Sequence, residues 1–286
     1  MTLHLRAAVR DGLVLLGSRN GLVLVAAIVA AELFALLVTV GTATQVLPLG
    51  DNGLVVEEPL PGTGESPPAA VEAIGGLLGG VVGSLVTIPG GIVAIRTFLI
   101  GERDRFPDPV LFHRLGRATL SVLLAGVVLT IAYVVLFVVP FVVTVPAVLA
   151  IGGFELFGPT GSFAIGVGLL GLSVTVAVLL TAFLWLSMVF VTQEIAIKDA
   201  GVVDALRGSW RATSGNRLRL LVLVGALVVV QLAVTLPASV PDSWGILALS
   251  LPVSGLLAAL WYAVLTRAYL DIHGEEAPVL VDRFRG

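Results

Sequence analysis

Long apolar runs separated by short polar connections are the main pattern along this chain. A membrane-spanning helix needs about 20 mostly apolar residues, because roughly 30 Å of hydrocarbon is crossed at about 1.5 Å per residue. The pattern predicts an all-α membrane protein, a bundle of six transmembrane helices in a single membrane domain over residues 1–286 with a short tail at 271–286. The predicted spans lie at residues 21–40, 73–95, 118–139, 163–191, 218–236 and 244–265.

Composition supports lipid as the solvent of this chain. Hydrophobic residues make up 57%, charged residues 12%, and the mean hydropathy is +1.07. Soluble domains carry about 25% charged residues, so this chain lacks the polar side chains for a fully water-facing surface. Cysteine is absent, which excludes disulfides and Cys metal sites. A net charge of −3 gives no reason to expect nucleic acid, and the arginine-rich, acidic composition resembles that of halophilic archaeal proteins.

The basic residues predict the orientation. The connections at 41–72, 140–162 and 237–243 contain no Lys or Arg, so all 16 basic residues lie in or beside the other connections and the termini. Basic residues in short loops stay in the cytoplasm. The split therefore predicts a multi-pass protein of the cell membrane with both the N- and the C-terminus in the cytoplasm.

Prolines interrupt two of the apolar runs. Apolar character continues after the third predicted span from Pro140 through Pro146 to Gly153. Because proline removes a helical hydrogen bond and clashes with the preceding turn, we expect the helix to end at Pro140. Residues 140–153 would then form an apolar lip at the outer surface, or alternatively a re-entrant turn. Pro89 should likewise kink or break the second span.

A basic amphipathic segment precedes each odd-numbered span. Apolar residues at helical spacing beside arginines are typical of a helix in the headgroup plane. The sequence therefore predicts three units, each an interfacial helix followed by a transmembrane hairpin, although chance amphipathicity of short basic loops is the alternative. The segments cover about 2–16, 108–117 and 199–213, with candidate capping residues Thr2, Asp108 and Asp199.

Small residues recur every four positions in the second span. Helices in lipid associate through small residues that allow close approach, so this helix should lie centrally and contact neighbours on more than one face. The alternative is a glycine-rich span without a fixed partner. The residues of this stripe that we expect to pack are Gly75, Gly79, Gly83 and Gly91.

Glu32 is the candidate for an intramembrane polar site. It lies eleven residues into the first span, roughly 16 Å from its start at helical rise. An acidic side chain there costs about 2.5–3.5 kcal/mol on insertion scales, and such groups often mark pathways. A structural carboxyl hydrogen-bonded inside the bundle is the alternative. Gln231 and Tyr133 are possible partners. Arg96, near the end of the second span, is expected to snorkel to the interface, with a pair to Glu32 as the weaker alternative.

Catalytic chemistry has few residues to use. His4, His113 and His273 have no metal-ligand spacing, and no nucleotide-binding or nucleophile motif is present. The sequence therefore predicts no catalytic residue, no metal and no cofactor. A membrane-embedded hydrolase remains a distant alternative.

Residues 188–222, MVFVTQEIAIKDAGVVDALRGSWRATSGNRLRLLV, resemble the membrane domain of the glycerophosphoryl diester phosphodiesterase family and related six-span proteins of unknown function. In that pattern a span ends in Glu and is followed by an Ala-Leu-x-x-Ser-Trp helix and a small polar turn. The resemblance implies a six-span fold and not the phosphodiesterase activity, which belongs to a separate soluble barrel. Glu194 is expected to pair with Lys198 or Arg207. The matching residues are Glu194, Ala205, Leu206, Ser209, Trp210, Gly215 and Asn216.

The leading functional hypothesis is a non-enzymatic membrane protein, a permease that handles lipids or small molecules. The alternative is a membrane scaffold or accessory subunit that docks a partner through its interfacial helices. The lipid bilayer is the expected partner in both cases, and basic residues beside the inner leaflet would attract anionic lipids.

Overall fold

The computed structural model describes residues 4–46, 69–101, 112–152, 162–238, 244–274 and 279. Within these ranges the chain forms helices and turns and no strands, as the sequence predicts. Many of the helices are far longer than those of soluble domains, which average about 11–12 residues. They are α1 (Leu5–Leu16), α2 (Arg19–Val46), α3 (Ala69–Ile100), α4 (Leu115–Gly152), α5 (Ser162–Ser187), α6 (Val191–Lys198), α7 (Val202–Thr213), α8 (Arg217–Ala238) and α9 (Trp244–His273).

Several of these helices are long and apolar enough to cross a membrane. In the described part of the chain five helical stretches meet that test, at Gly83–Ile100, Leu115–Pro146, Gly168–Lys198, Arg217–Val234 and Pro252–His273. A sixth is added if α1 and the described part of α2, which meet at an angle of 79°, count as one broken span. The protein is therefore multi-pass, and six remains the predicted number of spans.

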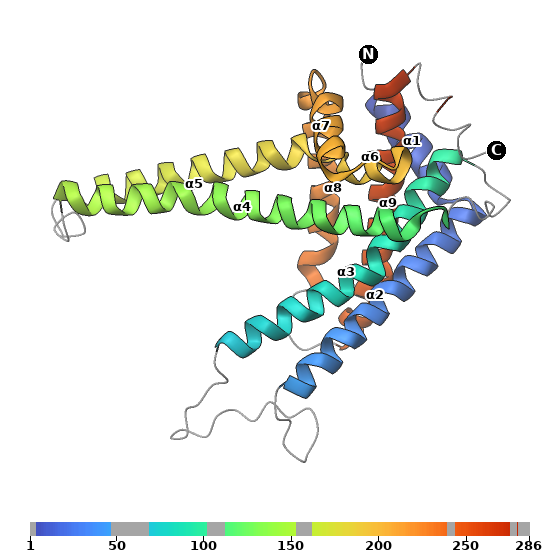
Figure 1. The fold of residues 1–286 in the computed structure, drawn as a ribbon, viewed down its shortest axis with the longest axis horizontal. Coiled ribbons are helices and arrows are strands. Elements are labelled where there is room, and N and C mark those ends of the chain that lie inside the picture. The colour runs from blue at the N-terminus through green and yellow to red at the C-terminus, as the bar shows by residue number, and fades with distance from the viewer. Residues whose placement is uncertain are drawn as a thin grey trace.

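Three helical hairpins diverge from a common region (Figure 1). The pairs α2–α3, α4–α5 and α8–α9 are each in contact, and their near ends meet α1, α6 and α7. The main apolar core lies in this region and joins α3, α6, α8 and α9. Its fully buried side chains include Ile95, Ile195, Leu220 and Tyr269. By contrast, only 6% of the residues in Leu115–Pro146 are buried, so the rest of the described chain leaves most of this apolar helix uncovered.

The expected end of a helix at Pro140 is wrong. Helix α4 continues through Pro140 and Pro146 to Gly152, and α3 continues through Pro89. Each proline removes one hydrogen bond of the ladder, while the many remaining bonds hold the helix in an apolar solvent that offers no other partners. Residues 140–152 are therefore neither a lip nor a re-entrant turn but the last turns of α4.

Two of the three predicted interfacial segments are separate helices. Helix α1 ends at Leu16 before a sharp bend, and α7 is bounded by turns on both sides. The second segment has no separate helix among its described residues, because Leu115 already begins α4, and Asp108 lies outside the described residues. Thr2 also lies outside them, and Gly201 rather than Asp199 precedes α7.

Helix α3 is central, as its small residues predict. It contacts α2, α4, α6 and α9. At Gly83 an added Cβ would lie 3.5 Å from that of Ala35, and at Gly91 it would lie 2.6 Å from the Tyr262 hydroxyl. Only a glycine at 91 leaves room for this close approach of α9. Gly75 and Gly79 also belong to α3, but their surroundings lie outside the description.

Candidate functional site

Arg96 is fully buried near the end of α3 and does not snorkel to an interface. Its Nε donates to the Ala196 carbonyl at 2.8 Å and its Nη1 to the His113 carbonyl at 2.8 Å. Its Nη2 donates to Asp199 Oδ1 at 3.1 Å, forming an ion pair. Snorkelling was the wrong expectation, because the ends of α3, α4 and α6 together provide acceptors for the guanidinium inside the bundle. No contact with Glu32 is among these bonds.

Asp199 takes part in this arrangement through its backbone as well as its side chain. It follows the last residue of α6 in a left-handed conformation, with φ 53° and ψ 30°. This conformation ends the helix, and Asp tolerates it better than most non-glycine residues. The turn places the Asp199 carboxylate opposite Arg96, so the chain reversal and the ion pair support one another.

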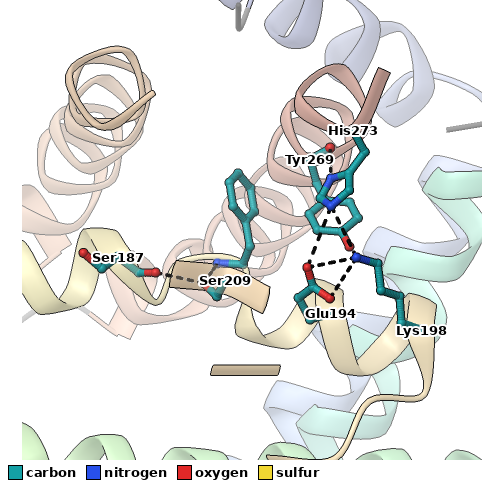
Figure 2. A network of polar contacts seen from close by, with 7 residues as sticks. Ser187, Glu194, Lys198, Ser209, Tyr269 and His273 are labelled. Atoms are coloured by element: carbon teal, nitrogen blue, oxygen red, sulfur yellow. Dashed lines mark hydrogen bonds and ion pairs between the residues drawn. The ribbon is translucent and has the colours of Figure 1, made fainter. Parts of the chain in front are cut away.

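Glu194, on α6, is a buried acid with a basic partner of its own (Figure 2). Glu194 is 3% exposed, and Lys198, one helical turn later, donates to it at 3.2 Å. The predicted Glu194–Lys198 pair is thus confirmed. His273 reaches the same group from α9: its Nε2 lies 3.3 Å from Lys198 Nζ and its Nδ1 lies 2.9 Å from the Tyr269 carbonyl. Because a carbonyl only accepts, Nδ1 carries a proton, and in the neutral ring Nε2 accepts from Lys198.

Helix α7 is joined to the end of α5 through Ser209 (Figure 2). Its hydroxyl donates to the Ser187 carbonyl at 2.9 Å and accepts from the Phe190 amide at 3.2 Å, across the turn between α5 and α6. At Gly208 an added Cβ would lie 2.6 Å from the Glu194 carboxyl carbon. The small residues of α7 therefore allow it to lie directly against α6. We call Arg96, Glu194, Lys198, Asp199, Ser209 and His273 the polar hub.

The remaining residues of the family-like motif have structural positions around the polar hub. Ala205 is fully buried and Leu206 packs against the core. Trp210 is 41% exposed, and the Arg217 guanidinium lies over its ring, 4.7 Å from the centroid. Gly215 has φ +91°, which an L side chain rarely adopts, and the Asn216 amide donates to the Thr213 carbonyl in the turn before α8.

Glu32 and Gln231, predicted as partners, line one cavity of about 340 Å³ between four helices. The acid comes from α2, Gln231 from α8, and the other walls from α9 and from the α5–α6 turn with the start of α6. Ser254 donates to Glu32 Oε2 at 2.6 Å. We call this space the Glu32 cavity. Its lining residues are Glu32, Val189, Thr192, Gln193, Gln231, Ser254, Ala258, Trp261, Tyr262 and Leu265.

The sequence missed several of the cavity's polar residues. Gln193 lies two residues beyond the predicted fourth span and has no predicted role, although it is 2% exposed and its Oε1 has no hydrogen-bond partner in the described part of the chain. Ser254 is small and common in transmembrane helices, and Tyr262 has the pattern of an ordinary span residue. Their spacing of eight residues on α9, about two turns, would have placed them on one face. Tyr133, named as a possible partner of Glu32, is not among the lining residues.

The cavity suits binding better than covalent chemistry. Its lining offers one carboxylate, two amides, hydroxyls and two aromatic rings, and no His, Lys, Arg or Cys is among these residues. A nucleophile needs a neighbouring base that can take its proton, and a metal needs several convergent ligands. No group of three or more His, Cys, Asp or Glu side chains suited to a metal lies in the described ranges.

Together these features define a multi-pass helical membrane protein with an open cavity between its helices that polar and apolar side chains line. The chain belongs to the family described as a domain of unknown function, DUF7847, whose family model matches residues 3–272. No curated protein and no solved structure matches the chain. The family match covers α1 to α9 almost completely, so the Glu32 cavity and all of the polar hub except His273 lie within it.

Proposed function

We propose that this protein is a non-enzymatic membrane permease that binds a small polar molecule in the Glu32 cavity. The observation that supports this function is the convergence of Glu32 and Gln231 on one space from α2 and α8, each from the middle of a long apolar helix. Polar groups within the bilayer are costly and are kept there mainly for packing or for ligands. Ligand cavities of roughly 300–1,000 Å³ are typical of small molecules, and about 340 Å³ is within this range.

The membrane context of the proposal follows from the charges. We propose that the protein lies in the cell membrane with both termini in the cytoplasm, where its basic residues contact anionic lipid headgroups. Because the chain has no cysteine, a single cysteine introduced at Gly274 can report the side of the membrane. It should stay unlabelled by an impermeant maleimide in whole cells and react after lysis. Labelling in intact cells would overturn the orientation.

The relation to the membrane domain of glycerophosphoryl diester phosphodiesterases is likewise a proposal, which the polar hub supports. The motif residues Glu194, Ala205 and Ser209 are all buried where α6 meets α7. They therefore explain a shared fold through packing, without any role in a reaction. A structure of such a membrane domain should show the same Ser hydroxyl between its α7 and the preceding span; a different contact there would refute the relation.

Native mass spectrometry of the protein, extracted from its own membrane, tests the proposed binding. Wild type should retain a small molecule. Ala258→Phe should lose it, because this side chain lines the cavity and a ring there fills the space. Ala226→Phe, on the exposed face of α8, is the matched control and should retain it. Equal spectra for wild type and Ala258→Phe, with lipid and detergent alone, would refute the proposal.

A further inference from the structure

The charge of the Glu32 cavity points to the class of molecule it binds. Glu32 is the one ionisable acid among the lining residues, and no basic side chain accompanies it there. The nearby cations of the polar hub are engaged elsewhere: Arg96 with Asp199 and two carbonyls, and Lys198 with Glu194. A ligand that takes the place of a proton on this carboxyl group would therefore bring its own positive charge.

The hydrogen-bonding groups of the cavity indicate a ligand that donates. Glu32 receives one hydrogen bond from Ser254, and an ionised carboxylate can accept about four. The Ser254 bond therefore leaves acceptor positions on Glu32 for further donors. An ammonium group carries such donors. Gln193 Oε1 also has no partner in the ranges that the structure describes, but it is buried away from the open space and offers a ligand no direct contact.

Two aromatic side chains complete the lining. Trp261 and Tyr262 lie side by side in the sequence of α9, and the Trp261 ring makes an edge contact with Trp185, with ring centroids 6.1 Å apart. Cations bind over aromatic faces, most strongly over tryptophan. A lining that contains both aromatic rings and a carboxyl group is therefore a suitable environment for an organic cation.

The size of the cavity excludes a bare metal ion as the natural occupant. A space of about 340 Å³ is an order of magnitude larger than one water, which occupies roughly 30 Å³ in the liquid. Val189, Ala258 and Leu265 also present apolar surface to it. Such a wall suits the carbon skeleton of a small amine rather than a hydrated ion.

We infer that the Glu32 cavity binds a small organic cation with a primary ammonium group, whose hydrogen bonds Glu32 accepts. This inference rests on the proposed function, because it names the ligand class of the same cavity. The apolar residues of the lining hold the carbon skeleton, and Trp261 and Tyr262 add aromatic faces to it. Neutral or anionic molecules of the same size would leave the carboxylate uncompensated and bind more weakly.

Three probes of similar size and different charge test this inference: benzylammonium, benzyl alcohol and benzoate. Binding to the purified full-length protein in nanodiscs is followed by the shift of the unfolding temperature with probe concentration. Benzylammonium should bind at least about tenfold more tightly than the other two. Glu32→Gln should remove this preference, and Ala258→Phe should abolish binding of all three. Asp204→Asn, on the exposed face of α7, is the control and should bind as wild type does.

The outcomes separate this inference from the proposed function. If the three probes bind equally and Ala258→Phe removes all of them, the cavity binds solutes but the ammonium assignment is wrong. If none binds while the extracted wild type retains a small molecule that Ala258→Phe loses, the ammonium assignment is again overturned and the permease proposal stands. If none binds and no molecule is retained, both are overturned.

Discussion

Two neighbouring residues of α6 carry buried polar side chains, and only one of these has hydrogen-bond partners for its side-chain oxygens. Glu194 faces the polar hub, where Lys198 and His273 surround its carboxylate. Gln193, its neighbour in sequence, faces the Glu32 cavity, where its amide oxygen has no partner in the described part of the chain. Both side chains are almost completely buried. Burial of a polar group therefore does not by itself distinguish a structural site from a binding site.

The polar hub and the Glu32 cavity differ in whether their polar groups have hydrogen-bond partners within the protein. In the polar hub, the Arg96 guanidinium donates to Ala196 and Asp199 at the end of α6 and to His113 just before α4. It therefore connects α3 to both of these helices. On the cavity side, Glu32 lines an open space and Gln193 keeps a buried amide oxygen that has no partner in the described part of the chain. A saturated network stabilises the fold, whereas an unsaturated one leaves room for a ligand. Substitutions on the two sides should consequently differ in their effect on stability.

Arg96→Met should have the largest effect. It keeps much of the side-chain length but removes the donors, leaving Asp199 without its cation and two carbonyls without their donor. Breaking a buried ion pair from one side costs about 3–5 kcal/mol. We expect a large fall in the unfolding temperature in detergent or a failure to fold. Arg207→Met, which removes an exposed arginine from α7, is the matched control and should unfold as wild type does. Equal stability of the two variants would contradict the structural role of the polar hub.

Gly208→Ala should have a smaller effect of definite sign. The new methyl group would lie 2.6 Å from the Glu194 carboxyl carbon, so this carboxyl must shift, and the shift disturbs its bond with Lys198. Overpacking of this kind costs about 1–3 kcal/mol. Gly225→Ala on α8, where no atom lies within 4 Å of the added Cβ, should instead stabilise by up to about 1 kcal/mol through helix propensity. Thermal unfolding of both variants measures the contrast, and a shared sign would refute the tight α6–α7 contact.

The apolar pattern predicts the helices better than it predicts their ends. The first, second, fifth and sixth predicted spans correspond to α2, α3, α8 and α9, whose ends lie within about eight residues of the expected ends. Lipid offers the backbone no hydrogen-bond partners, so a long apolar run must form its hydrogen bonds within a helix. The expected helix end at Pro140 was wrong, because the remaining backbone hydrogen bonds of α4 outweigh the steric effect of one proline. It also missed the turn after Ser187, which divides α5 from α6. That turn depends on Ser209, far along the chain, and no local pattern shows it.

The candidate sites were predictable to different degrees for a related reason. Glu32 and Gln231 stand out because each is polar within an apolar run, so their expected depth could be compared from sequence alone. The environment of Arg96 could not, since its partners Ala196 and His113 contribute backbone carbonyls, which every residue carries. Whether an arginine snorkels or is buried is decided by the tertiary positions of these acceptors, and hydropathy does not record them.

Gln193→Leu should have the smallest effect on stability of these variants. It therefore gives the most direct test of the difference between the two sides of α6. Leucine is close to glutamine in size and removes an amide whose oxygen is unpaired in the described structure, so we expect the free energy of unfolding to stay within about 0.5 kcal/mol of wild type or to rise. Ser209→Ala is the counterpart in the polar hub: it removes a hydroxyl that is both donor and acceptor and leaves the Phe190 amide without its partner, at a cost of about 1–3 kcal/mol. Unfolding of both variants without added ligand gives the comparison directly. A Gln193→Leu variant as unstable as Ser209→Ala would mean that Gln193 is a structural group, and the distinction between the two sides of α6 would then be lost.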